Sequence, residues 1–368
     1  MNEKSIPTRR PIVYISPYYD AKVPSGGNRR FDEICKRYMA EFGDDFTLMV
    51  AKGKTPPWWK GRNLIELDYE FNHASKFKVM REIARALDAM PPSVVILESV
   101  PIPFRALRRH MHVQVAYDFR YFTGDSKSFL YRMFFSRYLK MEWRRSEFML
   151  TCSEFSIDEL EKYVGYDPKR VIKSFFGIDE RVLDIASTPA PQKEYDIIYV
   201  GHFEKRKNHA PLVRALALIN KDIKVMFIGR DNGMKGEIVA LVKELGLTGV
   251  TFGPAVDDKT LWELYRKSRV FAYPSIYEGF GIPTIEALAL GVPAVISDIP
   301  VFHEVGADLV SYFDPHNPED IAKKIKVALE NPVVPSPESV RAHLAQFFWE
   351  NIYQNMKKDI DRLMSNTK

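Results

Sequence analysis

Residues 270–297 read VFAYPSIYEGFGIPTIEALALGVPAVIS, and this stretch decides the fold. It opens with an apolar run that ends at Tyr273 and predicts a buried strand, and it closes with a second such run at 294–297. Between the two runs, Pro283 suits the first turn of a helix, and Gly291 suits the position just after the last helical residue. A strand, a glycine-containing loop, a helix and another strand in succession are typical of a parallel sheet.

The same alternation of short apolar runs and helical periodicity extends along the whole chain. The predicted strands are 12–16, 46–51, 94–97, 113–117, 148–152, 196–200, 224–229, 250–252, 270–273 and 294–297. They fall into two sets, separated by the Pro-rich residues 187–192.

Two sets of alternating strands and helices predict two domains of the α/β class. We expect two doubly wound, Rossmann-like domains that face a central cleft. The first covers residues 1–186, and the second covers residues 187–346. Residues 347–368 continue as a helical pattern, which we expect to return to the first domain.

The composition is that of a soluble globular protein, with 46% hydrophobic and 27% charged residues among 368. No apolar run approaches the ~20 residues that span a bilayer, and the first residues contain no apolar segment of a signal peptide. The only two cysteines, Cys35 and Cys152, fall in predicted core positions. We therefore expect a cytoplasmic protein without disulfides or a metal site.

The loop and helix after Tyr273 predict an anion site. The two glycines of the loop allow the backbone to approach a ligand closely, and the N-terminus of a helix favours negative charge such as a pyrophosphate. Glu278 and Glu286 lie on either side of this loop. Because carboxylates repel a phosphate, they are better suited to accept hydrogen bonds from hydroxyl groups, which a sugar nucleotide offers at both ends.

Glu278 and Glu286, with seven residues between them, resemble the E-x7-E motif of retaining glycosyltransferase family 4, whose members have the GT-B fold. The likeness continues in shorter segments on both sides of the motif. These are Val200-Gly201-His202-Phe203-Glu204-Lys205-Arg206-Lys207-Asn208, Phe176-Gly177-Ile178-Asp179, Cys152-Ser153-Glu154-Phe155-Ser156, Pro24-Ser25-Gly26-Gly27 and Phe348-Trp349. The likeness is nearly complete in the C-terminal half and thin in the N-terminal half.

The resemblance implies a role for particular residues. Glu286 would bind the ribose hydroxyls of a nucleotide, Glu278 would bind and orient the donor sugar, and Arg206 and Lys207 would hold the pyrophosphate. The resemblance implies that Asp118 is a catalytic residue in the first domain, as Glu278, Arg206 and Lys207 are in the second. Further donor contacts would come from Gly26, Gly27, Gly201, Gly279, Phe280, Gly281 and Ile282.

Two positions depart from the family pattern. The family often has Arg after the glycine that follows the first strand of the second domain, whereas this chain has His202. Many members also carry a His-Asp pair after a strand of the first domain, and the matching place here is Tyr117-Asp118. Either Tyr117 or Asp118 would then face the acceptor or the donor sugar.

The resemblance implies transfer of a hexose-type sugar from a UDP- or GDP-linked donor to a hydroxyl of a glycan or a lipid-linked glycan. Retaining transfer of this kind is described as a front-face reaction, in which the leaving diphosphate accepts the proton of the acceptor. It needs no protein nucleophile, no cofactor and no metal, and the chain has no Asp-x-Asp triplet or His/Cys cluster of ligand spacing.

Other functions stay open at this point. A sugar-nucleotide epimerase or a phosphorylase would share the architecture, and a degenerate member would bind a sugar nucleotide without turnover. A nucleic-acid-binding protein is suggested only by the charge of residues 101–145, with ten Lys and Arg against three Asp and Glu. No nucleic-acid-binding motif accompanies that charge, so we expect no nucleic-acid partner.

Residues 127–145 (KSFLYRMFFSRYLKMEWRR) combine aromatic and basic side chains in a predicted helix. Such a helix could lie against the anionic inner face of a membrane and bring the chain to a lipid-linked acceptor. Alternatively, its aromatic side chains pack inside the first domain and its arginines are solvated. The apolar positions go most of the way round the helix, which favours burial.

Overall fold

The computed structural model describes residues 10–22, 25–69, 76–98, 107–123 and 129–365. The chain forms two compact units. The N-terminal unit comprises residues 1–175 and 353–368, and the C-terminal unit comprises residues 176–352. The chain passes from the N-terminal unit to the C-terminal unit between Phe175 and Phe176. This boundary lies before the Pro-rich residues 187–192, where the sequence predicted it.

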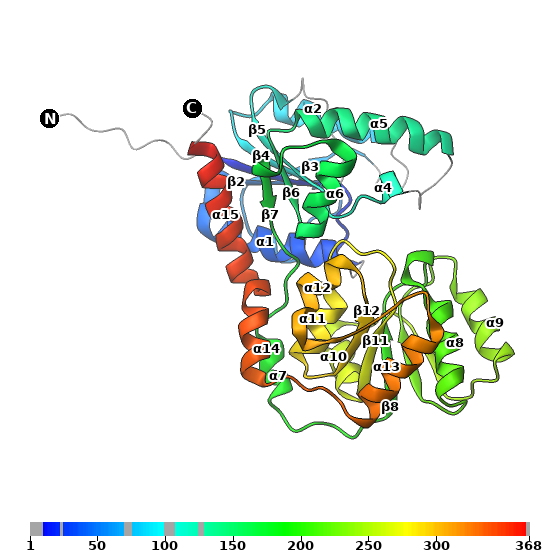
Figure 1. The fold of residues 1–368 in the computed structure, drawn as a ribbon. Coiled ribbons are helices and arrows are strands. Elements are labelled where there is room, and N and C mark those ends of the chain that lie inside the picture. Colours follow the sequence, from blue (N-terminus) through cyan, green and yellow to red (C-terminus); the bar gives the residue numbers. More distant parts are fainter. Residues whose placement is uncertain (1–9, 23–24, 70–75, 99–106, 124–128, 366–368) are drawn as a thin grey trace. The chain divides into compact units, whose positions relative to one another are not determined.

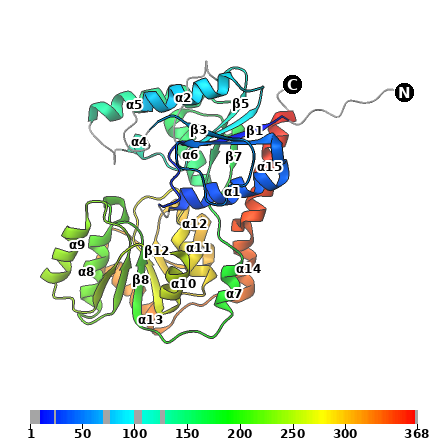
Figure 2. The ribbon, with the colours of Figure 1, turned by 180° about the vertical axis from the view of Figure 1, so that it is seen from behind.

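The N-terminal unit is built on a parallel sheet with the strand order β3-β2-β1-β4-β5-β6-β7 among the described residues. Its strands are β1 (Ile12–Ser16), β2 (Phe46–Ala51), β3 (Leu64–Leu67), β4 (Val94–Glu98), β5 (Met111–Val115), β6 (Phe148–Thr151) and β7 (Val171–Lys173). Its helices are α1 (Gly26–Phe42), α2 (Lys76–Asp88), α4 (Arg120–Thr123), α5 (Phe129–Arg145) and α6 (Glu154–Val164), with short 3-10 turns at Gly43–Asp45 and Pro168–Arg170. Helices α2 and α5 lie side by side over one face of the sheet, and α1 covers the other (Figures 1 and 2).

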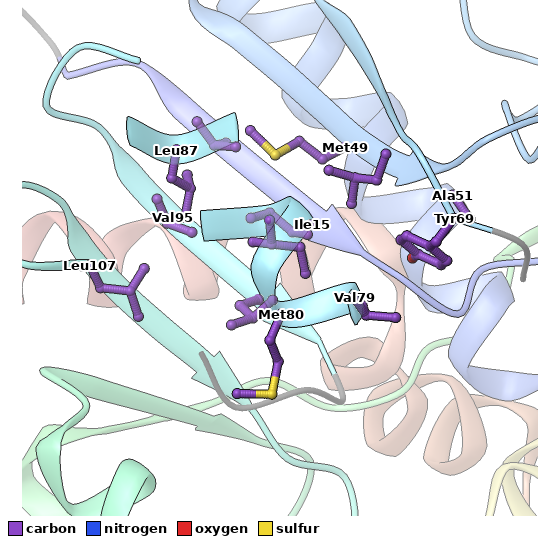
Figure 3. Close-up of a cluster of buried hydrophobic side chains, with 13 residues drawn as sticks. Ile15, Met49, Ala51, Tyr69, Val79, Met80, Leu87, Val95 and Leu107 are labelled. Carbon is purple, nitrogen blue, oxygen red and sulfur yellow. The ribbon is translucent and has the colours of Figure 1, made fainter. Parts of the chain in front are cut away.

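Successive side chains of β1 point to opposite faces of the sheet, and both faces are buried. Val13 and Ile15 point toward α2 and join a cluster with Val79 and Ile83 of that helix (Figure 3). Tyr14 points the other way, and its ring meets Phe31 of α1 edge to face. Both faces are apolar because helices cover both, as parallel sheets require.

The C-terminal unit repeats this plan with the strand order β10-β9-β8-β11-β12-β13 in the described part of the chain. Its strands are β8 (Tyr195–Val200), β9 (Val225–Ile228), β10 (Val250–Gly253), β11 (Ser268–Tyr273), β12 (Ala294–Ser297) and β13 (Ser311–Phe313). Its helices are α7 (Arg181–Ala186), α8 (His209–Ile219), α9 (Lys235–Glu244), α10 (Asp258–Arg266), α11 (Ile282–Ala289), α12 (Pro300–Gly306), α13 (Pro318–Glu330) and α14 (Pro337–Leu344), with 3-10 turns at Lys205–Lys207, Ala307–Leu309 and Ala345–Phe347.

The predicted strands all exist. Three match without a shift, and the ends of the others differ by at most two residues. One shift bears on the site: the strand predicted at 113–117 is β5 (Met111–Val115), so Tyr117 and Asp118 follow the strand and do not end it. The three strands that the sequence did not predict, β3, β7 and β13, are short and lie at sheet edges. Edge strands carry less of the apolar pattern from which strands are predicted. Cys35 and Cys152 are both buried, as predicted.

The last helix, α15 (Trp349–Ser365), begins in the C-terminal unit, and from Tyr353 onward it belongs to the N-terminal unit. Within the C-terminal unit, the start of this helix meets the first residues of the unit. Ile178 pairs with Phe348 in a parallel bridge, and a Cβ on Gly177 would lie 2.7 Å from the Trp349 ring. The two short segments that resemble family motifs in this region therefore pack against each other. No helix among the described residues is both long and apolar enough to cross a membrane.

Candidate active site

The C-terminal unit places its motif residues at the switch point of its sheet. Strands β8 and β11 are hydrogen-bonded neighbours, and the strand order continues from β8 to β9 on one side and from β11 to β12 on the other. In open parallel sheets, ligands bind at the carboxyl ends of the strands at such a point. The loop after β8 carries Arg206 and Lys207, and the loop after β11 carries Glu278.

A buried ion-pair cluster joins these two loops. The Nζ of Lys207 donates to Oε1 of Glu278 at 2.5 Å, and a terminal nitrogen of Arg206 donates to Oε2 at 2.5 Å. Tyr273, the last residue of β11, donates its hydroxyl to Oε1 of Glu278 at 2.9 Å and accepts a hydrogen bond from Lys207. The same Arg206 nitrogen donates to the carbonyl oxygen of Tyr277 at 3.0 Å. Both carboxylate oxygens of Glu278 are therefore held by cations.

This environment fixes the ionisation of Glu278. Burial by itself raises the pKa of Glu278, but Lys207 and Arg206 more than reverse this and lower it to about 2. Burial lowers the pKa of Lys207, with Glu278 opposing that change. Because Glu278 is ionised at physiological pH, it can accept hydrogen bonds, but it has no proton to donate to a leaving group.

Two members of the cluster were not predicted from the sequence. Glu204 pairs with the second terminal nitrogen of Arg206 at 2.6 Å, so that the guanidinium lies between two carboxylates. Tyr273 links Lys207 to Glu278, as described above. A polar hydroxyl at the carboxyl end of an apolar strand, five positions before Glu278, is the signal that would have identified Tyr273.

The loop after Glu278 leads directly into helix α11. Gly281 precedes the helix with a φ of 111°, and a Cβ there would lie 2.7 Å from the Phe302 ring. Both constraints require glycine. Pro283 occupies the first turn, as the sequence predicted, and Glu286 is buried further along the helix. The N-terminus of α11 thus lies at the end of the loop that carries Glu278, where the helix dipole favours an anion.

The remaining predicted residues of this unit lie around the same loops. Gly279 precedes Phe280 in the loop, and Ile282 begins α11 two residues after it. The ring of Phe280 packs against Phe176 and Phe347, while its backbone is part of the loop. Gly201 follows β8, where a Cβ would lie 2.7 Å from the Tyr199 hydroxyl and 3.6 Å from the Lys207 side chain.

His202 occupies the position at which the family often has Arg. Its Nδ1 accepts a hydrogen bond from the backbone N–H of Arg230 at 3.4 Å. Burial lowers the pKa of His202, and Lys207 adds to this. At neutral pH, the positive charge at this strand end therefore comes from Arg206 and Lys207.

Three of the predicted residues, Gly26, Gly27 and Asp118, belong to the N-terminal unit. Gly26 and Gly27 do not form a loop but begin α1, whose cap Ser25 accepts a hydrogen bond from Asn28. Asp118 follows β5 and pairs with Arg120 at 2.9 Å. Pro24, quoted with the two glycines, lies outside the described residues.

A sequence profile of the family described as glycosyl transferases group 1 matches residues 181–346, from the start of α7 into the 3-10 turn before α15. The match includes every residue of the ion-pair cluster. Residues 181–346 belong to the glycosyl transferases group 1 family. The family predicted from the motif of Glu278 and Glu286 is thereby confirmed for this group 1 domain.

Curated relatives align with both halves of the chain. The O-antigen chain mannosyltransferase B of Escherichia coli is 28% identical over 222 residues, which cover 56% of this chain and 58% of that protein. The O-antigen chain mannosyltransferase RfbU of Salmonella typhimurium is 27% identical over 242 residues, which cover 66% of each protein. The chain therefore aligns with less than two thirds of the length of these relatives.

Solved structures show the same fold as the group 1 domain and the N-terminal unit. Sucrose-phosphate synthase from Thermosynechococcus elongatus superposes with a TM-score of 0.75 at 19% identity and covers 98% of this chain and 100% of its own. WaaG, a glycosyltransferase involved in lipopolysaccharide biosynthesis, superposes with a TM-score of 0.70 at 20% identity, over 96% of this chain and 99% of its own. The chain has the GT-B fold, with two Rossmann-like α/β units.

Proposed function

We propose that this protein is a retaining glycosyltransferase that moves a hexose-type sugar from a UDP- or GDP-linked donor to a hydroxyl of a glycan or a lipid-linked glycan. The observation that carries the proposal is the placement of Glu278 between Lys207 and Arg206 at the switch point. Two cations and a helix N-terminus match the diphosphate of a sugar nucleotide, and an ionised carboxylate matches the hydroxyls of its sugar.

The chemistry follows from these charges. The bond between C1 of the sugar and the diphosphate oxygen breaks, and a bond from C1 to the acceptor oxygen forms on the same face. The proton of the acceptor hydroxyl passes to the departing diphosphate. Lys207, Arg206 and the start of α11 stabilise the negative charge that grows on the diphosphate, so that no metal is required. The low pKa of Glu278 excludes a role as general acid. Its ionised carboxylate instead accepts hydrogen bonds from sugar hydroxyls.

Mannose is the first candidate for the transferred sugar. The two relatives above are named as O-antigen chain mannosyltransferases, and they cover 56% and 66% of this chain. Another relative, at 29% identity over 170 residues, is named as an N-acetylgalactosaminyltransferase that acts on a diphospho-undecaprenol acceptor from Campylobacter jejuni. A lipid-linked glycan is therefore the first acceptor class to test.

The experiment is a donor screen with the purified protein. We expect one nucleoside diphosphate to bind in isothermal titration and the matching sugar nucleotide to be consumed in the presence of acceptor. Proton NMR of the product then reports whether the anomeric configuration is that of the donor. An inverted product would rule out the front-face mechanism, while transfer itself would stand.

A degenerate protein that binds a sugar nucleotide without turnover is the alternative. It predicts tight nucleotide binding and no sugar transfer with any glycan acceptor or with water. The intact set of Glu278, Glu286, Arg206 and Lys207 favours turnover. Glu278, Arg206 and Lys207 are joined in one ion-pair cluster, and Glu286 is buried in the helix that follows the loop of Glu278.

We further propose that the protein works in the cytoplasm and contacts the inner face of a membrane through α5. Phe134 is 66% exposed and Met141 is 42% exposed, and the exposed Arg137 lies between them on the same side of the helix. Phe77, at the start of the neighbouring α2, is 79% exposed. Solvent-exposed apolar side chains beside basic ones suit an anionic bilayer. The opposite side of α5 is buried through Leu139 and Trp143, as expected for a helix packed on the sheet.

Flotation with liposomes that contain anionic lipid tests this contact. We expect binding that weakens as salt is raised and that is lost in the double variant Phe134→Ser, Arg137→Glu. The matched control reverses two exposed charges on α13, Lys323→Glu with Lys326→Glu, and should float like the unmodified protein. A protein that stays at the bottom of the gradient at low salt would show that α5 does not dock on membranes.

A further inference from the structure

A second buried polar cluster lies at the switch point of the N-terminal unit, between β1 and β4. Glu98, the last residue of β4, is 5% exposed and accepts three hydroxyl hydrogen bonds. The donors are Tyr14 at 2.8 Å, Ser16 at 2.7 Å and Tyr117 at 2.5 Å. Tyr14 and Ser16 belong to β1, and Tyr117 follows β5. One carboxylate therefore joins the ends of three neighbouring strands.

Arg30 of α1 completes the cluster from the helix side. Its side chain is 0% exposed, and one terminal nitrogen donates to the hydroxyls of Tyr14 at 3.3 Å and Tyr117 at 3.2 Å. The other terminal nitrogen donates to Ser174, just after β7, at 2.7 Å and approaches the sulfur of Met356 in α15 at 3.6 Å. We call these residues the Glu98–Arg30 frame: Tyr14, Ser16, Arg30, Glu98, Tyr117 and Ser174.

The two tyrosines link the opposite charges in a defined direction. Burial raises the pKa of both Tyr14 and Tyr117 well above the ordinary value, so both hydroxyls keep their protons. Between these two partners, each hydroxyl therefore donates to Glu98 and accepts from Arg30. A chain of hydrogen bonds with one allowed direction holds its members in one arrangement.

Stability alone does not account for such a frame. Replacing buried ion pairs by apolar side chains of similar volume is often neutral or stabilising, because desolvation offsets the attraction. The Nε of Arg30 is also buried and has no hydrogen-bond partner among the described residues, which adds to the cost of burial. The frame does, however, hold β1, the end of β4, the segments that follow β5 and β7, and helix α1 in fixed relative positions.

The segments that the frame joins lie next to the residues of this unit to which the motif resemblance gave a role, Asp118 and the donor-contacting Gly26 and Gly27. Asp118 directly follows Tyr117, and the glycines that begin α1 lie one turn before Arg30. The carbonyl oxygen of Tyr117 also accepts a hydrogen bond from the Cys152 thiol at 3.2 Å. We propose that Glu98 and Arg30 are positioning residues, which hold Asp118 and the N-terminus of α1 in the arrangement needed for sugar transfer. This rests on the proposed function.

The test removes one hydroxyl and keeps the ring. We expect Tyr117→Phe to lower kcat about tenfold or more, as loss of one hydrogen bond to a charged group allows. The affinity for the free nucleoside diphosphate should change much less than kcat, because Glu286, Arg206 and Lys207, which we propose hold the nucleotide and its diphosphate, lie in the other unit. The matched control is Tyr38→Phe on α1, since the Tyr38 hydroxyl is buried without a partner among the described residues. This control should turn over like the unmodified protein.

Glu98→Gln provides an independent variant, because it removes the charge and places an N–H₂ where the hydroxyls donate. It should lower kcat at least as much, and the double variant with Tyr117→Phe should lose less than the product of the two single effects. Hydrogen exchange gives a readout that does not need activity. Amides 26–30 and 117–120 should exchange faster in Tyr117→Phe and unchanged in Tyr38→Phe.

The outcomes separate the two proposals. If both frame variants turn over like the unmodified protein at a temperature where they are folded, the positioning role is overturned even when their melting temperatures fall. Unchanged exchange at both segments overturns it as well, whether or not activity is found. If the unmodified protein transfers no sugar, the proposed glycosyltransferase function fails, and the exchange result alone decides whether the frame holds the loops.

Discussion

Lys207 and Glu278 form a buried ion pair at 2.5 Å although they lie 71 positions apart in the sequence. The pair joins the loop after β8 to the loop after β11, which leave neighbouring strands. Arg206 takes the other oxygen of the same carboxylate, and Tyr273 bridges the pair. Because the carboxylate of Glu278 holds the two loops together, a substitution of any residue of this ion-pair cluster should affect the other residues of the cluster.

Lys207→Ala should lower kcat by roughly 10²-fold or more, because a cation that stabilises the leaving diphosphate is lost. Turnover with the donor found in the screen measures this, with circular dichroism to check the fold. Lys205→Ala is the matched control, since Lys205 lies in the same 3-10 turn and is exposed. Near-normal turnover in both Lys207→Ala and Arg206→Ala would remove these residues from the mechanism.

Glu278 should make the stability of the protein depend on pH. Its pKa falls from 4.5 to about 2 on folding, so its contribution is fully present above pH 4.5 and is lost as the pH falls toward 2. Urea unfolding should therefore show a loss of roughly 2 kcal/mol between pH 7 and pH 3, because about 1.5 of the pKa units between 4.5 and about 2 lie above pH 3, at about 1.4 kcal/mol each. Glu278→Gln should flatten this dependence, whereas Glu338→Gln, at an exposed position, should not. An unchanged slope in Glu278→Gln would show that other carboxylates cause it.

Glu286→Ala should weaken binding of the free nucleoside diphosphate by ~1–3 kcal/mol, the range for a hydrogen bond to a charged group. The reason is its buried place in α11, where we propose that it holds the ribose hydroxyls. Isothermal titration measures the change, with Glu263→Ala on the exposed side of α10 as the control. Equal affinities for all three proteins would exclude Glu286 from the nucleotide site.

Turnover should survive excess EDTA, because the proposed mechanism stabilises the diphosphate with Arg206, Lys207 and the start of α11. The assay compares initial rates before and after dialysis against the chelator. A loss of activity that Mg²⁺ or Mn²⁺ restores would show that the transfer requires a metal.

Gly177→Ala should destabilise the C-terminal unit, by about 1–3 kcal/mol as overpacking does. Its Cβ would lie 2.7 Å from the ring of Trp349 and 2.8 Å from Ile352, which cannot both move away in a packed interior. Gly236→Ala in α9 is the control, because nothing lies within 4 Å of its added Cβ and alanine favours the helix. Thermal unfolding should show a lower midpoint for the first variant and an equal or higher one for the second.

Much of the group 1 domain could be predicted from the sequence, because its signals are local. The apolar strand before Tyr273, the proline in the first turn of α11 and the glycine after its end each act within a few residues, and all three are found as predicted. The spacing of Glu278 and Glu286 indicated the family for the same reason. Strands β3, β7 and β13 were missed because short edge strands carry too few apolar positions to form a pattern.

The partners of each charged side chain were decided only by the tertiary structure. From the sequence, Glu278 was assigned to the sugar and Arg206 and Lys207 to the diphosphate, without a contact between them. No pattern in the sequence indicates that Glu204, Arg30 or Glu98 belong to buried clusters. These contacts arise because the chain crosses over its own sheet, so that β8 lies beside β11 and β1 lies beside β4. Periodicity records which face of an element is buried, but it carries no information about which strand ends become neighbours. The strand ends meet at the carboxyl edge of each sheet. There, the order of the strands, which the sequence pattern does not record, decides which charged side chains become neighbours.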